Sequence, residues 1–138
     1  MSKVAVVYWS GTGNTEAMAN SVADGAKSAG AEVAVMTASE FTSADNYDSI
    51  AFGCPAMGAE VLEEGEFQPM WDGVKGSLGN KKVVLFGSYG WGTGEWMDSW
   101  VDDAKTAGVN LVADPVIANE APDDTSIDAC KALGATLA

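Results

Sequence analysis

The 138-residue chain is predicted to fold as a single α/β domain, residues 1–138, with a doubly wound parallel sheet and helices on both faces. Two patterns predict this fold. Short apolar runs alternate along the chain with longer segments of helical period. These runs are apolar at consecutive positions, which is typical of strands that are covered on both faces. A hydrophobic content of 47% is sufficient for the core that such a fold requires.

The first half of the chain predicts three strands and one long helix. The apolar run within residues 3–9 predicts the first strand. Met18, Val22 and Ala26 stand at helical spacing within residues 16–29, and Gly30 is expected to end that helix as its C-cap. Apolar residues at 33–37 and 49–53 predict the next two strands. Residues 40–47 between them predict a loop with a short helix.

The second half continues the alternation after an acidic loop at residues 54–66. A helix is predicted at 67–76, where Pro69 falls in the first turn and is tolerated. Trp96 and Trp100 lie one helical turn apart and are expected to face the core. The remaining predicted segments are a strand at 81–87, a Gly-rich loop at 88–94, a helix at 95–107, a fifth strand in two pieces at 109–113 and 116–118, and a last helix at 124–137.

The composition excludes several classes of function. There is no His, and all seven basic residues are Lys, so His-based catalysis, His metal ligands and arginine fingers are excluded. A net charge of −13 argues against nucleic acid and anionic membranes as partners. The two cysteines match no metal spacing and no disulfide framework, which suits a reducing compartment. With no membrane-spanning run and no signal-peptide pattern, the expected location is the cytoplasm.

A loop rich in hydroxyl and glycine residues joins the first strand to the first helix. It reads Ser10-Gly11-Thr12-Gly13-Asn14-Thr15. Its glycines let the backbone approach a ligand, and its hydroxyls and the first helical N–H groups suit a phosphate. Asn14 or Thr15 is the expected N-cap. No Lys follows Gly13, and Glu16 breaks the dinucleotide pattern, so a phosphomonoester end fits best; an ordinary strand-to-helix turn is the alternative.

Two further loops leave the carboxyl ends of predicted strands. They read Cys54-Pro55-Ala56-Met57-Gly58-Ala59-Glu60 and Ser88-Tyr89-Gly90-Trp91-Gly92-Thr93-Gly94. Parallel strands end at a common edge, so these loops and the Ser10–Thr15 loop are expected to converge. Met57 and Trp91 offer soft or flat contacts to a ring, unless they fold back onto the core. The three loops together favour a phosphorylated planar aromatic ligand.

These three motifs, in this order and spacing, resemble the flavodoxins over the length of the chain. No long insertion interrupts the fifth strand, so the chain is similar to the short-chain subgroup. The resemblance implies a five-stranded parallel sheet in the order 2-1-3-4-5 with non-covalently bound FMN. It also implies low-potential one-electron transfer between redox enzymes, mainly between semiquinone and hydroquinone, without substrate turnover. The alternative is a small FMN-dependent NAD(P)H reductase, although no second nucleotide loop and no Arg are present.

The resemblance also implies roles for individual residues. The Ser10–Thr15 loop would hold the FMN phosphate, and Met57 and Trp91 would flank the isoalloxazine ring. Gly58 would carry a carbonyl that turns toward flavin N5, next to Ala59, and Glu60 would accept from flavin N3. Asn119 and Glu120 resemble a further loop near the ring. The full predicted set of cofactor-binding residues is Ser10, Gly11, Thr12, Gly13, Asn14, Thr15, Pro55, Ala56, Met57, Gly58, Ala59, Glu60, Ser88, Tyr89, Gly90, Trp91, Gly92 and Asn119.

The charges are distributed unevenly along the predicted elements. Six of the seven lysines stand at strand starts or late in helices, whereas the loop at 54–66 holds Glu60, Glu63, Glu64 and Glu66 and no base. Acidic residues at helix N-termini account for part of this bias, but not for these four in one loop. The pattern predicts a negative ligand end, whose partners are redox proteins with basic docking surfaces. The chain is expected to be a monomer.

Overall fold

The structure is a computed structural model that describes residues 2–11, 13–57, 62–90 and 94–138. Its strands are β1 (Lys3–Tyr8), β2 (Glu32–Thr37), β3 (Ser49–Gly53), β4 (Lys82–Tyr89), β5 (Asn110–Leu111) and β6 (Val116–Asn119). Its α-helices are α1 (Asn14–Ser28), α2 (Phe67–Val74), α3 (Glu95–Thr106) and α4 (Asp124–Ala135). Short 3-10 turns, η1 (Ala38–Glu40) and η2 (Lys75–Ser77), follow β2 and α2.

The strands form one parallel sheet in the order β2-β1-β3-β4-β5, with β6 also paired to β4. Val6 of β1 lies between Val35 of β2 and Ala51 of β3. The fifth position is filled by β5 beside the start of β4 and by β6 beside its end. The predicted parallel sheet and its order are therefore confirmed.

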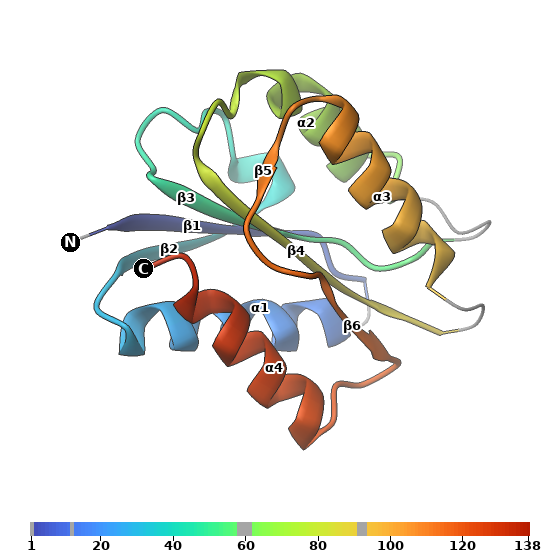
Figure 1. The fold of residues 1–138 in the computed structure, drawn as a ribbon. Coiled ribbons are helices and arrows are strands. Elements are labelled where there is room, and N and C mark those ends of the chain that lie inside the picture. The colour runs from blue at the N-terminus through green and yellow to red at the C-terminus, as the bar shows by residue number, and fades with distance from the viewer. Residues whose placement is uncertain (1, 12, 58–61, 91–93) are drawn as a thin grey trace.

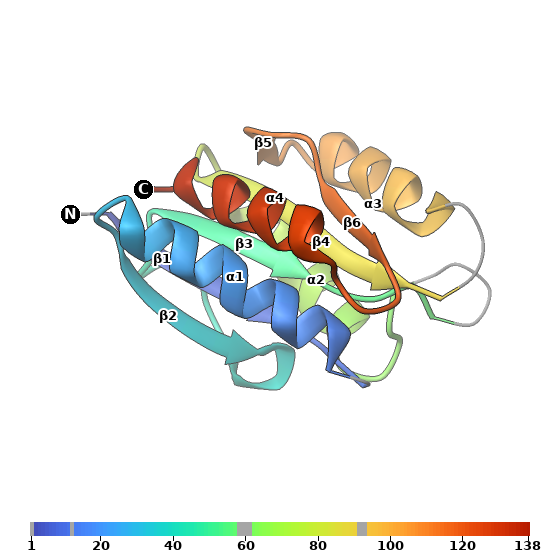
Figure 2. The same cartoon turned by 90° about the horizontal axis from the view of Figure 1, so that it is seen from below.

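Helices cover both faces of this sheet, as predicted. Figures 1 and 2 show α2 and α3 on one side and α1 and α4 on the other. Phe52, Trp71 and Trp100 belong to the core under α2 and α3, and Met18 and Val84 to the core under α1 and α4. The indoles of Trp96 and Trp100 are buried, as the helical spacing predicted.

The two ends of α1 differ from the prediction in a way that bears on the ligand loop. The N-cap is Gly13, with a φ of 92°, and neither Asn14 nor Thr15 caps the helix. A left-handed glycine lets α1 begin at Asn14, two residues earlier than predicted, so Asn14 and Thr15 lie within its first turn. At the other end the C-cap is Ala29, and the left-handed residue that follows it is Gly30, with a φ of 100°.

β4 is longer than predicted at its carboxyl end. Ser88 and Tyr89 were expected in a loop, but they pair with Ala118 and Asn119 of β6. Pairing between segments so far apart in the sequence has no local signal, and this explains the difference. As a result, two of the predicted ligand residues stand on a strand that is fixed on both sides. Within the described residues, no helix has the length and apolar character needed to cross a membrane.

Candidate cofactor-binding site

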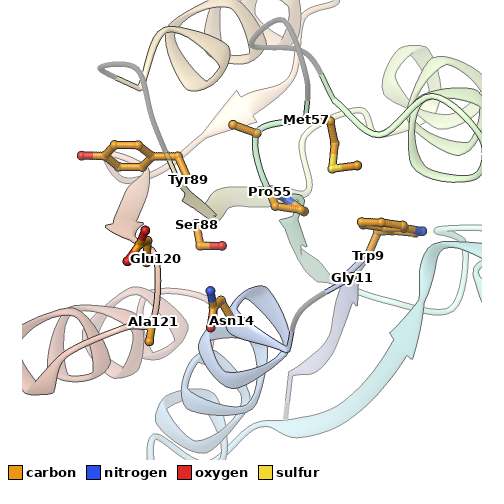
Figure 3. Close-up of a pocket in the computed structure, with 11 residues that line it drawn as sticks. Trp9, Gly11, Asn14, Pro55, Met57, Ser88, Tyr89, Glu120 and Ala121 are labelled. Carbon is orange, nitrogen blue, oxygen red and sulfur yellow. The ribbon is translucent and has the colours of Figure 1, made fainter.

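A cleft of about 580 Å³ opens at the carboxyl ends of β1, β3 and β4. Segments that are far apart in the sequence meet there, as predicted for the three loops, and the segment after β6 joins them (Figure 3). The residues that line the cleft are Trp9, Gly11, Asn14, Pro55, Ala56, Met57, Ser88, Tyr89, Gly90, Glu120 and Ala121.

The start of α1 forms a polar part of the cleft wall. Asn14, the first residue of α1, lines the cleft together with Gly11. The Ser10 hydroxyl accepts a hydrogen bond from the Gly13 N–H at 3.0 Å, which closes the loop between them. The first N–H groups of an α-helix have no partner within the helix and attract anions. This end of the cleft therefore offers neutral donors and a helix dipole rather than a cationic side chain.

Two buried hydroxyls link α1 to β4 beside the cleft. Thr15 Oγ1 lies 3.3 Å from Ser88 Oγ, and the two residues are only 1% and 4% exposed. Ser88 lines the cleft, whereas Thr15 lies behind it. A buried hydroxyl that lost its partner would cost free energy, so this pair holds the first turn of α1 against the end of β4.

Apolar side chains form another part of the wall. Trp9, Pro55, Ala56 and Met57 contribute to it, and the close-up shows Trp9 and Met57 on the opposite side of the cleft from Tyr89. The segment after β3 is held against β4, because the Ala56 N–H donates to the Ser88 carbonyl at 3.0 Å. A flat apolar ligand could pack on this wall without desolvating polar groups.

The backbone after β3 approaches β4 closely at Gly87. A Cβ atom on Gly87 would lie 2.2 Å from the Cys54 carbonyl oxygen. That same oxygen accepts a hydrogen bond from Trp96 Nε1 at 3.1 Å. Cys54 itself is fully buried, as predicted, and burial raises the pKa of its thiol to about 12. The thiol is therefore uncharged and serves as a small core residue.

Glu120 stands at the opposite rim of the cleft in an uncommon backbone conformation. Its φ is 57°, and its N–H donates to the Tyr89 carbonyl at 2.6 Å. The Tyr89 ring in turn packs against the ring of Trp96, with centroids 5.6 Å apart. Asn119, the preceding residue, is exposed and does not line the cleft.

One of the loop glutamates has a structural role. The Glu63 carboxylate accepts hydrogen bonds from the N–H groups of Gly65, Glu66 and Phe67, at 2.7 to 2.9 Å, where α2 begins. Burial opposes the charge on Glu63, but the hydrogen bonds from Phe67, Glu66 and Gly65 outweigh it and lower the pKa. Helix N-termini were not expected to account for any of the four glutamates in this loop. That prediction is wrong for Glu63, because its carboxylate binds N–H groups at the start of α2.

The structure thus brings most of the described predicted residues to one place. Those that line the cleft are Gly11, Asn14, Pro55, Ala56, Met57, Ser88, Tyr89 and Gly90. Those that are described but do not line it are Ser10, Gly13, Thr15 and Asn119. Those that lie outside the described residues are Thr12, Gly58, Ala59, Glu60, Trp91 and Gly92. Trp9 and Ala121 line the cleft without having been predicted; the position of Trp9 directly after β1 was the available signal.

A phosphorylated ring compound fits this cleft. Its volume falls within the range of small-molecule sites, and it combines apolar walls with a few convergent polar groups. The Ser88 hydroxyl and the α1 N-terminus suit a phosphate and its polyol linker, and Met57 and Trp9 suit a ring. Binding where strand order reverses is a general rule for open parallel sheets, and flavodoxins are themselves an example of it.

Comparison with known proteins agrees with this geometry. The family model for flavodoxin matches residues 6–134. The chain is 46% identical to a flavodoxin of Megasphaera elsdenii over 95% of each chain, and 42% identical to one of Clostridium beijerinckii over 96% of this chain and 97% of that one. It is also similar to the solution structure of two-electron reduced M. elsdenii flavodoxin, with a TM-score of 0.86 over 97% of each chain. Oxidised flavodoxin 1 of Bacillus cereus is 26% identical and has a TM-score of 0.84 over 99% of this chain and 97% of that one. The chain therefore belongs to the flavodoxin family of FMN-binding electron carriers, and the alternative of a small NAD(P)H reductase is not favoured.

Proposed function

We propose that residues 1–138 form one FMN-binding domain and that the cleft holds the cofactor, with the phosphate at the start of α1. The observation that supports this most directly is the make-up of the cleft. It joins a helix N-terminus and neutral hydroxyls to an apolar wall that contains Trp9 and Met57. A ligand with an anionic end and an apolar aromatic end matches both parts.

Residues 10–15 bind the phosphate in this proposal. Ser10, Thr12 and Thr15 supply hydroxyls, and Asn14 and the first N–H groups of α1 supply amide donors. The loop has no cation, so binding depends on the direction of these donors and on the dipole of α1. The contact between Thr15 and Ser88 keeps α1 and β4 at a fixed separation, and the cofactor then bridges them.

The ring of the cofactor lies against the segments that follow β3 and β4. As the family resemblance implies, Met57 and Trp91 would flank the ring and Gly58 and Glu60 would bind its polar edge. Trp9, which lines the cleft, is added to the apolar wall. Bound FMN accepts and returns single electrons. The residues of the chain hold it in place, exclude water from its faces and set the local charge, and they need no acid, base or metal to do so.

We further propose a cytoplasmic monomer whose partners are redox proteins with basic docking surfaces. Lys27 and Lys105 stand in the last turns of α1 and α3, at the end of the sheet opposite the cleft. Glu16 and Asp98 stand in the first turns of the same helices, on the side of the cleft. With a net charge of −13, this asymmetry directs a negative field toward an approaching partner.

The test uses FMN-loaded protein that has been reduced chemically and mixed with a basic one-electron acceptor protein at several salt concentrations. Glu64→Gln with Glu66→Gln removes two exposed charges from the loop before α2 and leaves the Glu63 hydrogen bonds intact. We expect a lower association rate with a weaker salt dependence. Glu32→Gln with Asp45→Asn makes the same change in charge at the opposite end and should alter the rate little. Equal effects of the two pairs would contradict a directed encounter.

A further inference from the structure

The loop that follows β3 begins and ends at two residues that contact each other. Cys54 is the first residue after β3, and the Glu63 N–H donates to Cys54 Sγ at 3.3 Å. Met57 lies between them in the sequence and lines the cleft, whereas Cys54 and Glu63 do not line it. A hydrogen bond outside the cleft therefore closes a loop, residues 54–63, that contributes a side chain to the cleft wall.

The first arm of this loop, residues 54–56, is held against β4 and α3. The Cys54 N–H donates to the Phe86 carbonyl at 3.2 Å, and the Cys54 carbonyl accepts from Trp96 Nε1 at 3.1 Å. The Ala56 N–H donates to the Ser88 carbonyl at 3.0 Å. The position of this arm is therefore set by the central part of the sheet and by α3.

The second arm, residues 62 and 63, is held by α2. The Glu63 carboxylate binds three N–H groups where α2 begins, and the Glu63 carbonyl accepts from the Gln68 N–H at 2.8 Å. Leu62 is buried in the core under α2 and α3. The second arm therefore follows α2 while the first follows β4, and the hydrogen bond to the Cys54 thiol joins the two.

The Cys54 thiol is well placed to join the arms. Its residue is 0% exposed, so water does not compete for the sulfur. A thiol can accept and donate at once, and Cys54 Sγ accepts from the Glu63 N–H while it donates to the Pro55 carbonyl at 3.5 Å. Removal of the sulfur would take away the acceptor of the Glu63 N–H and free one arm of the loop from the other.

We propose that Cys54 and Glu63 are a positioning pair, whose contact holds the 54–63 loop in the conformation that binds the ring of the cofactor. This rests on the proposed function, because the loop acts on FMN only if FMN occupies the cleft. Gly58 and Glu60 fall within this loop in the sequence, outside the described residues, and the family resemblance implies that they bind the edge of the ring.

The consequence of this pairing is a dependence of the reduction potentials on a thiol that does not line the cleft. The resemblance implies that the Gly58 carbonyl contacts the ring in some redox states and not in others. Such a differential contact separates the two one-electron reduction potentials of bound FMN. A loop whose arms are no longer joined makes this contact less well, so the two potentials move closer together.

The test compares Cys54→Ala, which removes the acceptor, with Cys54→Ser, which keeps an acceptor at the same position. Spectroelectrochemistry of the FMN-loaded protein gives the two potentials, and amide hydrogen exchange reports the Glu63 N–H. Cys54→Ala should reduce the separation of the potentials and speed the exchange, and Cys54→Ser should restore most of both. Cys54→Ala should also weaken FMN and riboflavin binding equally, by up to about fivefold, which is the equivalent of one hydrogen bond of about 1 kcal/mol.

Cys130→Ala is the matched control. Cys130 is also 0% exposed, but it lies in α4 and belongs to the core on the other face of the sheet. This variant should lose some stability, as any truncated core residue does, and leave the two potentials and the Glu63 exchange rate unchanged.

Each outcome bears on a different claim. An absorbance titration first establishes whether FMN binds; without binding, the proposed function fails and the positioning role fails with it. If FMN binds and the potentials of Cys54→Ala match those of Cys130→Ala, the positioning role is wrong while the proposed function stands. Equal shifts in Cys54→Ser and Cys54→Ala would also overturn it, because the acceptor would then not be what matters.

Discussion

Replacement of Gly87 with alanine tests how the fold closes the cleft. The new Cβ would lie 2.2 Å from the Cys54 carbonyl oxygen and 3.1 Å from the ring of Trp96. The carbonyl belongs to the backbone and cannot rotate away as a side chain would. The segment after β3 must therefore move off β4, and it carries Pro55, Ala56 and Met57 of the apolar wall with it.

The cost of this change has two sources. Overpacking of a well-packed site costs about 1–3 kcal/mol. Displacement of the Cys54 carbonyl also weakens its hydrogen bond from Trp96 Nε1, and an ordinary hydrogen bond contributes about 1 kcal/mol. We expect the free energy of unfolding to fall by about 2–4 kcal/mol in total. We also expect FMN to bind more weakly, because the wall that contacts its ring is displaced.

The assay is urea unfolding of the FMN-free protein together with a fluorescence titration of FMN. Gly73→Ala is a matched control, because Gly73 lies in α2 and a Cβ there would meet nothing within 4 Å. This control should stabilise the protein by about 0.5–1 kcal/mol through helix propensity and leave the FMN affinity unchanged. An unchanged unfolding free energy and FMN affinity in Gly87→Ala would show that close packing at Gly87 does not hold the segment after β3 in place.

Three further predictions concern the supports of the fold and the site. In Gly134→Ala the new Cβ would lie 1.9 Å from the Val22 carbonyl oxygen, so α4 should separate from α1 and stability in urea should fall by about 1–3 kcal/mol; unchanged stability would contradict this. Because hydrogen bonds hold the pKa of Glu63 below its usual value of 4.5, Glu63 stabilises the fold above pH 4.5, and this contribution is lost as the pH falls through the lowered pKa. Glu63→Gln should therefore flatten the acid limb of a plot of unfolding free energy against pH, and an unchanged limb would argue against the role. Thr15→Val removes the hydroxyl partner of Ser88 and should lower stability by about 1 kcal/mol and weaken FMN binding more than riboflavin binding; an equal loss for the two ligands would show that Thr15 does not serve the phosphate.

Much of the fold could be predicted because its signals are local. The apolar run in residues 3–9 and the helical spacing of Met18, Val22 and Ala26 are sufficient to place β1 and α1. The predicted N-cap of α1 was wrong, because the sequence does not distinguish a left-handed glycine that caps a helix, such as Gly13, from a glycine in an ordinary turn. The last two residues of β4 were missed because their pairing with β6 depends on the tertiary fold.

Part of the candidate site could be predicted, because the carboxyl ends of parallel strands lie at the same edge of the sheet. Asn14, Met57 and Ser88 were predicted together in this way, and all three line the cleft. Trp9 was not predicted, because a large aromatic residue at a strand end belongs to the core as often as to a binding site. Glu63 was predicted to have only an electrostatic role. The turn in which three N–H groups donate to its carboxylate forms only in the folded chain.

The proposed binding of the FMN phosphate at the start of α1 is tested by comparing the affinities of the FMN-free protein for FMN and riboflavin. Each hydrogen bond to a charged group contributes about 1.5–3 kcal/mol, so every lost phosphate contact should weaken binding by about tenfold or more. We expect FMN to bind far more tightly than riboflavin, and Ser10→Ala to reduce the difference between the two affinities. Equal affinity for the two ligands would contradict the proposed phosphate site.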